Sequence, residues 1–526
     1  MKYKIVVCDP IHEIGFEILK KAEDVELIDA SQTPKDELLK IIEDADGVIT
    51  RSPTPVDEKF LNSVNKLKAV VRAGVGVDNV DIEGASKKGI IVMNVPTANT
   101  IAAVELTMCH LTASMRAFPN AVNALKKDKE WIREKWLGNE LYGKKLGIIG
   151  FGNIGSRVGV RAKGFGMEVI AYDPYINPSK ATDLGVKYTT NFDDILECDV
   201  ITIHTPKNKE TIDMITKTEI AKMKDGVRLI NCARGGLYNE DDVLEGLRSG
   251  KIAWLGIDVF NAEPLSDHPF WNEENTSVTP HIGANTKESQ EKIAQQAAEN
   301  ILEAVRGISY PNALNLPIKA NETPEWAIKY LELSQKMGYL TAQMIDKAIS
   351  KVKVKAFGDI AKYSNSILTF SLVGAMTEIV GENVNYVNAK FLAEEKGIEL
   401  ETEEKSNESC AYKNLVKLEI YTDTQVYTIS GTIFDDNFRI VEIKGFELEF
   451  EPKGNFIFFR NTDVPGVIGE VGMTLAKNNI NISDFRLGRN QNEAMAVIIT
   501  DSKVTKDVID ELSKLKAAIS VKAAQI

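Results

Sequence analysis

The chain has few cysteines, few histidines and no long apolar run. Its five cysteines in 526 residues are scattered, odd in number and form no C-x-x-C pair, which argues against a disulfide or zinc framework, so we expect no bound metal. No uninterrupted apolar run approaches the roughly 20 residues that cross a bilayer. The N-terminus begins as a strand rather than as a signal peptide. These absences predict a cytoplasmic protein without a membrane partner.

Basic residues are also in the minority. The formal net charge of −13 argues against general nucleic-acid binding, which needs basic surface to displace counterions. Any site for an anionic substrate must therefore be locally basic. The length of 526 residues is too great for one core and predicts about three to four domains.

The stretch Leu146–Asp173 has the order strand, glycine loop, helix, strand and acid. In its run G-F-G-N-I-G, Gly150 permits a tight turn, Gly152 lets backbone approach a pyrophosphate, and Gly155 lets the helix pack close to the strand. Asp173 can accept hydrogen bonds from ribose hydroxyls and would repel a 2′-phosphate, which favours NAD over NADP. Glycines also occur in ordinary turns, but the flanking strands and the acid favour a dinucleotide-binding loop.

Before this loop, strand-like runs alternate with helix-like ones, which predicts a small parallel α/β domain. The strand-like runs are Ile5–Cys8, Gly47–Thr50, Ala69–Val71 and Ile90–Met93. Arg51 and the small-residue loop Arg72–Asn79 follow two of these runs, at the sheet edge where ligands bind. The loop amides and the Arg51 guanidinium can bind an anion, although Arg51 alone could equally be a surface residue.

Several longer segments predict helices. A mostly apolar helix is expected at Ile101–Met115, buried between domains or subunits. A helix from about Thr286 to Val305 should lead the chain back to the first domain, and a further helix is expected around Tyr330–Ile349. The last unit opens at Phe456–Phe459 and has the order strand, loop, helix, strand, strand and helix, which is typical of a ferredoxin-like unit.

The expected fold class is α/β, with two Rossmann-like doubly wound domains followed by an α+β intervening domain and a ferredoxin-like domain. The predicted units are a substrate-binding domain at 1–98 completed by 283–315, a dinucleotide-binding domain at 99–282, an α+β domain at 316–450 that begins with a linker at Leu316–Pro324, and a C-terminal domain at 451–526.

Three polar residues, Arg234, Glu263 and His281, lie at strand ends or in the loops that follow them. Oxidation of a secondary alcohol needs a base, and an imidazole with an ordinary pKa of about 6.5 suits proton transfer at neutral pH. A carboxylate can orient that ring, and a guanidinium can hold a substrate carboxylate and polarise the neighbouring oxygen. Each residue alone could be structural; together with the dinucleotide loop they favour a catalytic trio.

A set of short motifs carries a resemblance to a known family. The motifs are Arg51-Ser52, Arg72–Asn79, Gly150–Gly155, Tyr172–Pro174, Asn231–Leu237, Gly256–Phe260 and Pro280–Ala284. On these motifs the chain resembles, from end to end, the D-isomer-specific 2-hydroxyacid dehydrogenases, and within them the long phosphoglycerate dehydrogenase branch.

The resemblance implies roles for individual residues. It makes Arg234, Glu263 and His281 the catalytic trio, with His281 as acid and base, and it assigns substrate binding to Arg51, Val75, Gly76 and Asn99. The implied NAD contacts are Gly150, Gly152, Asn153, Ile154, Gly155, Asp173, Thr205, Cys232, Ala233, Arg234, Asp258, His281, Ile282, Gly283 and Ala284.

The C-terminal part implies a substrate and an effector. The last 70 or so residues resemble an ACT domain, in which Asp463 and Asn481 occupy ligand positions. The resemblance implies oxidation of 3-phospho-D-glycerate to 3-phosphohydroxypyruvate, the first step of L-serine synthesis, with L-serine as a possible inhibitor. The alternatives are another D-2-hydroxyacid dehydrogenase, such as a glyoxylate or hydroxypyruvate reductase, and an NADH-sensing regulatory protein. We expect a homotetramer or homodimer.

Overall fold

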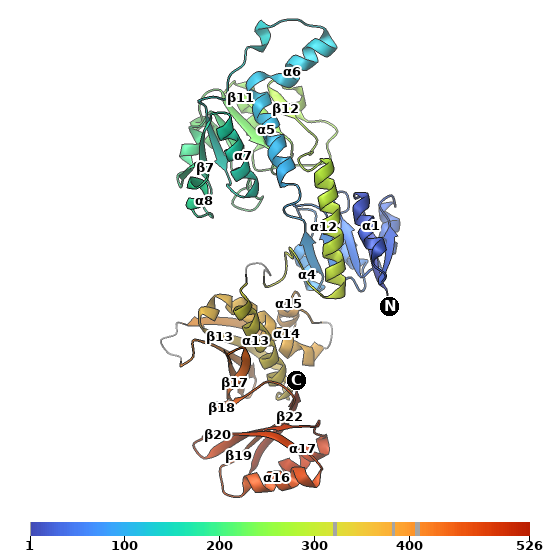
Figure 1. Ribbon diagram of the computed structural model, residues 1–526, viewed down its shortest axis with the longest axis vertical. Coiled ribbons are helices and arrows are strands. Elements are labelled where there is room, and N and C mark those ends of the chain that lie inside the picture. The colour runs from blue at the N-terminus through green and yellow to red at the C-terminus, as the bar shows by residue number, and fades with distance from the viewer. Residues whose placement is uncertain (1, 319–322, 381–383, 406–410) are drawn as a thin grey trace.

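The computed structural model describes residues 2–318, 323–380, 384–405 and 411–526. Over these ranges four β-sheets form, and the units that contain them follow one another along the long axis of an extended molecule (Figure 1). The expected fold class is confirmed. No helix in these ranges is long and apolar enough to span a membrane. In the same ranges, no three His, Cys, Asp or Glu side chains are grouped so that they could hold a metal.

The first sheet is parallel throughout, with strand order β2-β1-β3-β4-β5. Its strands are β1 (Tyr3–Val7), β2 (Val25–Asp29), β3 (Gly47–Thr50), β4 (Ala69–Arg72) and β5 (Ile91–Asn94), and its helices are α1 (Glu13–Lys21), α2 (Lys35–Ile41), α3 (Glu58–Asn62) and α4 (Ile82–Lys87). Helix α12 (Lys287–Arg306) lies beside α1 and against β3 and β4 (Figure 1). Gly47 permits this packing, because a Cβ there would lie 2.7 Å from Val305 Cγ1.

The second sheet is also parallel, with order β12-β11-β10-β9-β6-β7-β8. Its strands are β6 (Lys145–Ile149), β7 (Glu168–Tyr172), β8 (Lys187–Thr189), β9 (Val200–Ile203), β10 (Val227–Asn231), β11 (Ile252–Ile257) and β12 (Thr276–Val278). Its helices are α5 (Thr100–Arg116), α6 (Phe118–Asn123), α7 (Asn153–Gly164), α8 (Ser179–Thr182), α9 (Asp193–Leu196), α10 (Lys217–Lys222) and α11 (Glu240–Arg248). The strand order reverses between β6 and β9, where a parallel sheet opens a crevice for a ligand.

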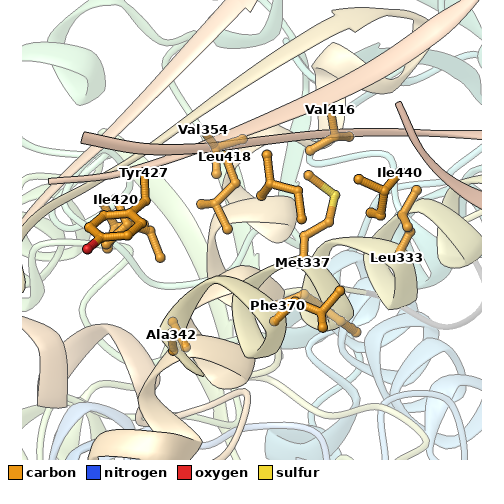
Figure 2. Close-up of a cluster of buried hydrophobic side chains, with 14 of the residues drawn as sticks. Leu333, Met337, Ala342, Val354, Phe370, Val416, Leu418, Ile420, Tyr427 and Ile440 are labelled. Carbon is orange, nitrogen blue, oxygen red and sulfur yellow. The ribbon is translucent and has the colours of Figure 1, made fainter. Parts of the chain in front are cut away.

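The third sheet is mixed: β13 and β14 are parallel and the other neighbours are antiparallel, in the order β14-β13-β15-β16-β17-β18. Its strands are β13 (Ile349–Gly358), β14 (Glu399–Lys405), β15 (Asn414–Thr422), β16 (Val426–Phe434), β17 (Asn437–Ile443) and β18 (Phe446–Phe450), and its helices are α13 (Glu325–Gln343), α14 (Ser364–Val380) and α15 (Ala389–Glu395). Figure 2 shows Leu333 and Met337 of α13 and Phe370 of α14 beneath Val354 and Leu418 of the sheet.

The sequence prediction placed the end of the helix in this domain too late. The helix predicted at Tyr330–Ile349 is α13, which ends at Gln343, and Ile349 already begins β13. The apolar residues near the helix end suit either structure, but Ile349 pairs with Thr422 of β15 and so joins the sheet. Part of the predicted linker Leu316–Pro324 lies outside the described residues.

The fourth sheet is antiparallel, with order β20-β21-β19-β22. Its elements are β19 (Asn455–Thr462), α16 (Val467–Lys477), β20 (Ile482–Asn490), β21 (Glu493–Thr500), α17 (Lys506–Ser513) and β22 (Ala518–Gln525). The predicted element order missed β22, which pairs with β19 and completes the ferredoxin-like sheet. Alternate residues of β19 face opposite sides: Ile457 and Phe459 pack with α16 and α17, while Phe456 and Phe458 join the core of the third sheet.

Candidate active site

A cleft of about 540 Å³ lies between the first and second sheets and is lined by residues of both. All of the predicted catalytic and substrate residues line it: Arg51, Val75, Gly76, Asn99, Arg234, Glu263 and His281. Arg72 and the predicted cofactor contact Ala284 join them. These side chains come from distant parts of the sequence and converge because the strands before them end at facing sheet edges.

His281 and Glu263 form a hydrogen-bonded pair in the cleft. Nδ1 of His281 lies 2.5 Å from Oε2 of Glu263, while Oε1 accepts a hydrogen bond of 2.8 Å from the Phe260 N–H. Burial raises the pKa of Glu263, but the bonds from His281 and Phe260 outweigh it, so the pKa lies below the ordinary value. The carboxylate therefore stays ionised and orients the ring, and Nε2 is the nitrogen that can exchange a proton with a bound molecule.

Three guanidinium groups surround the cleft. Burial, together with the nearby charges of Arg234 and Arg51, lowers the pKa of Arg72 to about 10. Nε of Arg72 is buried with no hydrogen-bond partner, while its Nη2 donates to Ser52 Oγ at 2.7 Å. Nε of Arg234 lies 3.2 Å from Asp78 Oδ2. Asp78 and the nearby Asp9 offset part of this positive charge, but the unpartnered Nε of Arg72 leaves the cluster able to bind an anionic ligand.

Arg72 is the functional candidate that the sequence analysis missed. It was named only as the first residue of a loop, yet it ends β4 beside the strand that precedes Arg51, with Thr50 and Arg72 in register. A charged residue that closes an apolar parallel strand was the available signal. The neighbouring glycine leaves room for it, because a Cβ on Gly74 would lie 1.7 Å from Arg72 Nη1. Gly76 does the same for Arg234, whose Nη2 would lie 2.3 Å from an added Cβ.

The loop after β6 forms a cradle that a dinucleotide fits. Gly150 has φ +86°, a Cβ on Gly155 would lie 2.1 Å from Gly150 O, and a Cβ on Gly152 would meet nothing within 4 Å. The loop is thus tight where it must turn and open where a phosphate would approach. Next to this loop, His204 Nδ1 and Thr205 Oγ1 are buried without hydrogen-bond partners, so both atoms could form a hydrogen bond with a bound ligand.

The other predicted cofactor residues lie along the same sheet edge. Asn153 and Ile154 begin α7, and Asp173 follows β7 and accepts hydrogen bonds from the Phe151 N–H at 2.9 Å and the Tyr175 N–H at 3.0 Å. Cys232 and Ala233 follow β10, and burial raises the pKa of the Cys232 thiol, which keeps it protonated. Their contacts with NAD remain predictions.

Asp258 holds the turn that carries His281. It is fully buried, and its oxygens accept hydrogen bonds from Ile282 N at 2.8 Å, Gly283 N at 2.8 Å and Thr279 Oγ1 at 2.6 Å. His281 itself has φ +52°, in the left-handed region that a residue with a side chain rarely adopts. The predicted contact of Asp258 with NAD is untested, whereas its contact with this turn is direct.

The two predicted effector residues do not meet in one cavity. Asp463 lines a cavity of about 520 Å³ in the C-terminal domain, where its Oδ2 lies 3.3 Å from Nε of Arg489. Asn481 is not among the residues that line this cavity, and its amide donates to Asp501 Oδ2 at 2.6 Å. The geometry therefore supports Asp463 as a ligand contact more directly than Asn481.

A dinucleotide cradle that faces a carboxylate–imidazole pair and a cluster of guanidinium groups defines an NAD-dependent dehydrogenase for an anionic substrate. The family models agree. Residues 108–283 match the NAD-binding domain of D-isomer specific 2-hydroxyacid dehydrogenases, residues 328–444 match the D-3-phosphoglycerate dehydrogenase intervening domain, and residues 456–517 match the ACT domain.

Curated relatives extend the match over almost the whole chain. D-3-phosphoglycerate dehydrogenase of Bacillus subtilis is 37% identical over 525 residues, covering 99% of both chains. The protein of that name from Methanocaldococcus jannaschii is 37% identical and covers 97% of this chain and 98% of its own. The chain belongs to the D-3-phosphoglycerate dehydrogenase family, a branch of the D-isomer specific 2-hydroxyacid dehydrogenases.

Solved structures match somewhat more than half of the chain, at 59% and 58% coverage. The TT0316 protein of Thermus thermophilus is 32% identical, with a TM-score of 0.54, and covers 59% of this chain and 99% of its own. D-lactate dehydrogenase of Aquifex aeolicus, solved with NAD and lactic acid, is 29% identical with a TM-score of 0.51, and covers 58% of this chain and 96% of its own.

Proposed function

We propose that this protein oxidises 3-phospho-D-glycerate to 3-phosphohydroxypyruvate with NAD, the first step of L-serine synthesis, and that it acts in the cytoplasm. The observation that carries the proposal is the convergence of Arg51, Arg72 and Arg234 on the cleft that holds the His281–Glu263 pair. A phosphate and a carboxylate on one small substrate match such a cluster, whereas an unphosphorylated 2-hydroxy acid would leave part of it without a counter-charge.

Each residue of the cleft has its own role in the proposed oxidation. His281 takes the proton of the C2 hydroxyl through Nε2, and Glu263 stabilises the imidazolium that results. Arg234 holds the substrate carboxylate and polarises the C2 oxygen. The Gly150–Gly155 loop would hold NAD, with Asp173 available to its ribose hydroxyls, and bound NAD would accept the hydride from C2.

Arg51 and Arg72 are the proposed phosphate contacts. Burial lowers the pKa of Arg51 while nearby Asp9 opposes that shift, and its Nη1 donates to Pro10 O at 3.0 Å. Val75 and Gly76 would offer backbone amides, and Asn99 has its Oδ1 buried without a partner at the cleft. Each of these groups could form a hydrogen bond with a substrate oxygen or hydroxyl.

The test is NADH formation with 3-phospho-D-glycerate and trapping of the keto product. Turnover of this substrate supports the proposal. Turnover of only glyoxylate or hydroxypyruvate in the reverse direction would make the protein another 2-hydroxyacid dehydrogenase. NADH binding without turnover of any of these substrates would favour a regulatory protein.

The C-terminal cavity suggests L-serine as an effector. Asp463 and Arg489 present one carboxylate and one guanidinium to a cavity that is otherwise mostly apolar, and opposite charges of this kind suit the ammonium and carboxylate groups of an amino acid. Inhibition by L-serine, with loss of that inhibition on substitution of Asp463, is the expected result.

We also propose that the chain assembles as a homodimer or homotetramer. The sequence analysis expected this apolar helix to be buried between domains or subunits, but most apolar residues of α5 are already buried against α7 and the second sheet, so α5 offers little surface for assembly. Exposed apolar side chains instead follow it, in the segment that projects beyond α6 (Figure 1): Trp131 is 81% exposed and Leu137 is 91% exposed. Light scattering in solution tests the assembly.

A further inference from the structure

A second histidine, His110 of α5, lies buried behind the cleft and plays no part in the proposed chemistry. Its Nδ1 lies 2.8 Å from Ser277 Oγ, and its Nε2 lies 3.1 Å from Thr279 Oγ1. Burial lowers its pKa to about 4, so the ring is neutral near pH 7. Gly256 makes this placement possible, because a Cβ there would lie 2.8 Å from His110 Cβ.

The direction of each hydrogen bond follows from the carboxylate of Asp258, which can only accept. Thr279 Oγ1 lies 2.6 Å from Asp258 Oδ1 and must give its single proton to it. Thr279 can then only accept from His110, so the ring carries its proton on Nε2. A neutral ring with Nε2–H has a bare Nδ1, which must accept from Ser277 Oγ.

The chain of bonds is complete at its other end. Ser277 Oγ, which gives its proton to His110, accepts one from Trp254 Nε1 at 3.2 Å. Each hydroxyl in the chain thus donates once and accepts once, and all donors point towards Asp258. A chain polarised in one direction is stronger than its separate bonds, and it fixes one tautomer of His110.

The chain ends on the turn that carries His281. Asp258 accepts hydrogen bonds from Ile282 N and Gly283 N, both at 2.8 Å, and these amides directly follow the residue with φ +52°. A residue held in the left-handed region costs free energy and persists only where its neighbours fix it. The orientation of the His281 ring therefore depends on Asp258, and that of Asp258 on Thr279 and His110.

We propose that His110 is a positioning residue for the dehydrogenase reaction: its Nε2–H, through Thr279 and Asp258, holds the turn that presents His281 to the substrate. The proposal rests on the role of His281 given above. His110 touches neither substrate nor cofactor, so its loss should lower the rate of the chemical step and leave NADH binding intact.

Two substitutions of His110 separate positioning from packing. In His110→Gln, the longer amide can place an N–H donor near the position of Nε2 and so reach Thr279. In His110→Asn, the shorter amide reaches only Ser277. Thr279→Val removes the link itself, and Thr112→Val is the matched control, because Thr112 lies on α5 and bonds only to the backbone of its own helix.

The first readout is steady-state kinetics with measured NADH affinity. His110→Asn and Thr279→Val should each lower kcat by roughly tenfold or more, the effect of one lost hydrogen bond in a chain that ends on a charged group. His110→Gln should stay within about threefold of the unmodified protein, and the double variant His110→Asn/Thr279→Val should be no worse than either single one. Equal losses in His110→Gln and His110→Asn, or losses confined to the melting temperature, would overturn the proposal.

The second readout needs no activity. Hydrogen exchange of the peptide that holds Ile282 and Gly283 should speed up at least roughly tenfold in His110→Asn and Thr279→Val, and stay slow in His110→Gln and Thr112→Val. If the unmodified protein oxidised no 2-hydroxy acid, the proposed function would fail and this exchange would still decide whether His110 holds the turn. Unchanged exchange in Thr279→Val would contradict the positioning role itself.

Discussion

The cleft of the first two domains and the charged face of the third sheet differ in how fully their basic groups are paired. In the first 315 residues, Arg51, Arg72 and Arg234 converge on one cleft, and the buried Nε of Arg72 has no hydrogen-bond partner. In the third sheet, by contrast, Lys353 lies 2.5 Å from Glu401 and 3.0 Å from Glu403. The exposed ion pairs of the third sheet contribute little stability, whereas a guanidinium nitrogen without a partner in a cleft is available to bind an anion.

The third sheet and the two parallel sheets also differ in how their strands are buried. Alternate residues of β13 face a core or a charged surface: Val352 and Val354 are buried in the core with α13 and α14, while Lys351 and Lys353 pair with glutamates on the other side. Inner strands of the two parallel sheets, such as β3 and β9, are instead buried along their whole length, and polar residues with roles in the cleft follow where such strands end. A parallel sheet thus concentrates its polar groups at one edge, where catalysis can use them.

Removal of the proposed acid and base should have the largest effect. In His281→Asn, kcat should fall roughly 10²- to 10⁴-fold, because the proton transfer loses its base, while NADH affinity is kept. Asparagine tolerates the positive φ of this position, so the turn should survive. The control is His268→Asn, which breaks another His–Glu pair, 3.3 Å apart and outside the cleft, and should leave kcat within about twofold. Equal losses in the two variants would contradict the assignment.

The next effect should come from the arginine cluster. Arg72→Met removes one charge-assisted contact, so kcat/KM for 3-phospho-D-glycerate should fall roughly 10- to 100-fold. The value for D-glycerate, which lacks the phosphate, should change little, and this second substrate is the internal control. A loss of the same size for both substrates would show that Arg72 supports the loop rather than the phosphate.

A smaller effect is expected from the proposed effector site in the C-terminal domain. Asp463→Ala should raise the L-serine concentration for half-inhibition by roughly tenfold, the effect of one lost charged hydrogen bond, and leave kcat unchanged. Asp484→Ala is the matched control. Oδ2 of Asp484 lies 2.9 Å from Nε of Arg486, and Asp484 does not line the cavity. Inhibition that survives Asp463→Ala would place the effector elsewhere.

The smallest effect should come from the paired charges of the third sheet. Hydrogen bonds from Lys405 and Lys353 lower the pKa of Glu403 to about 2. A lowered carboxyl pKa adds stability above the ordinary value of 4.5, and this is lost as pH falls towards 2. Lys353→Met should therefore lower the melting temperature by only about 1–2 °C at neutral pH, because exposed pairs contribute little, and by less near pH 3. A larger loss at pH 3 than at pH 7 would contradict this explanation.

The sequence predicted those parts of the site that lie in short contiguous runs. The loop Gly150–Gly155 was recognisable because strand, turn and helix follow one another directly, and the strand ends before Arg234 and His281 pointed to one sheet edge. Arg72 was missed because its partners are 20 or more residues away: Ser52, Arg51 and Arg234. The network around His110 could not be predicted, because nothing in its helical sequence shows which strand it faces.

The fold was predictable to a similar degree. Buried parallel strands give continuous apolar runs with clear ends, so the inner strands of the first two sheets could be identified, whereas the edge strands β2, β8 and β12 were missed. The strand β22 was missed because its buried residues, Val521 and Ala524, do not alternate as in a regular strand and the segment is rich in alanine, so its pairing with β19 identifies it. The pairing of β22 with β19, rather than the strand preference of its own residues, makes this segment a strand.

The ratio of kcat/KM for 3-phospho-D-glycerate to kcat/KM for D-glycerate, measured by NADH formation, tests the central claim most directly. If the guanidinium groups of the cleft select a phosphorylated substrate, the ratio should be at least roughly 100, the effect of two charged hydrogen bonds to the phosphate. A ratio near one would mean that these arginines serve the protein's own structure, and would contradict the account.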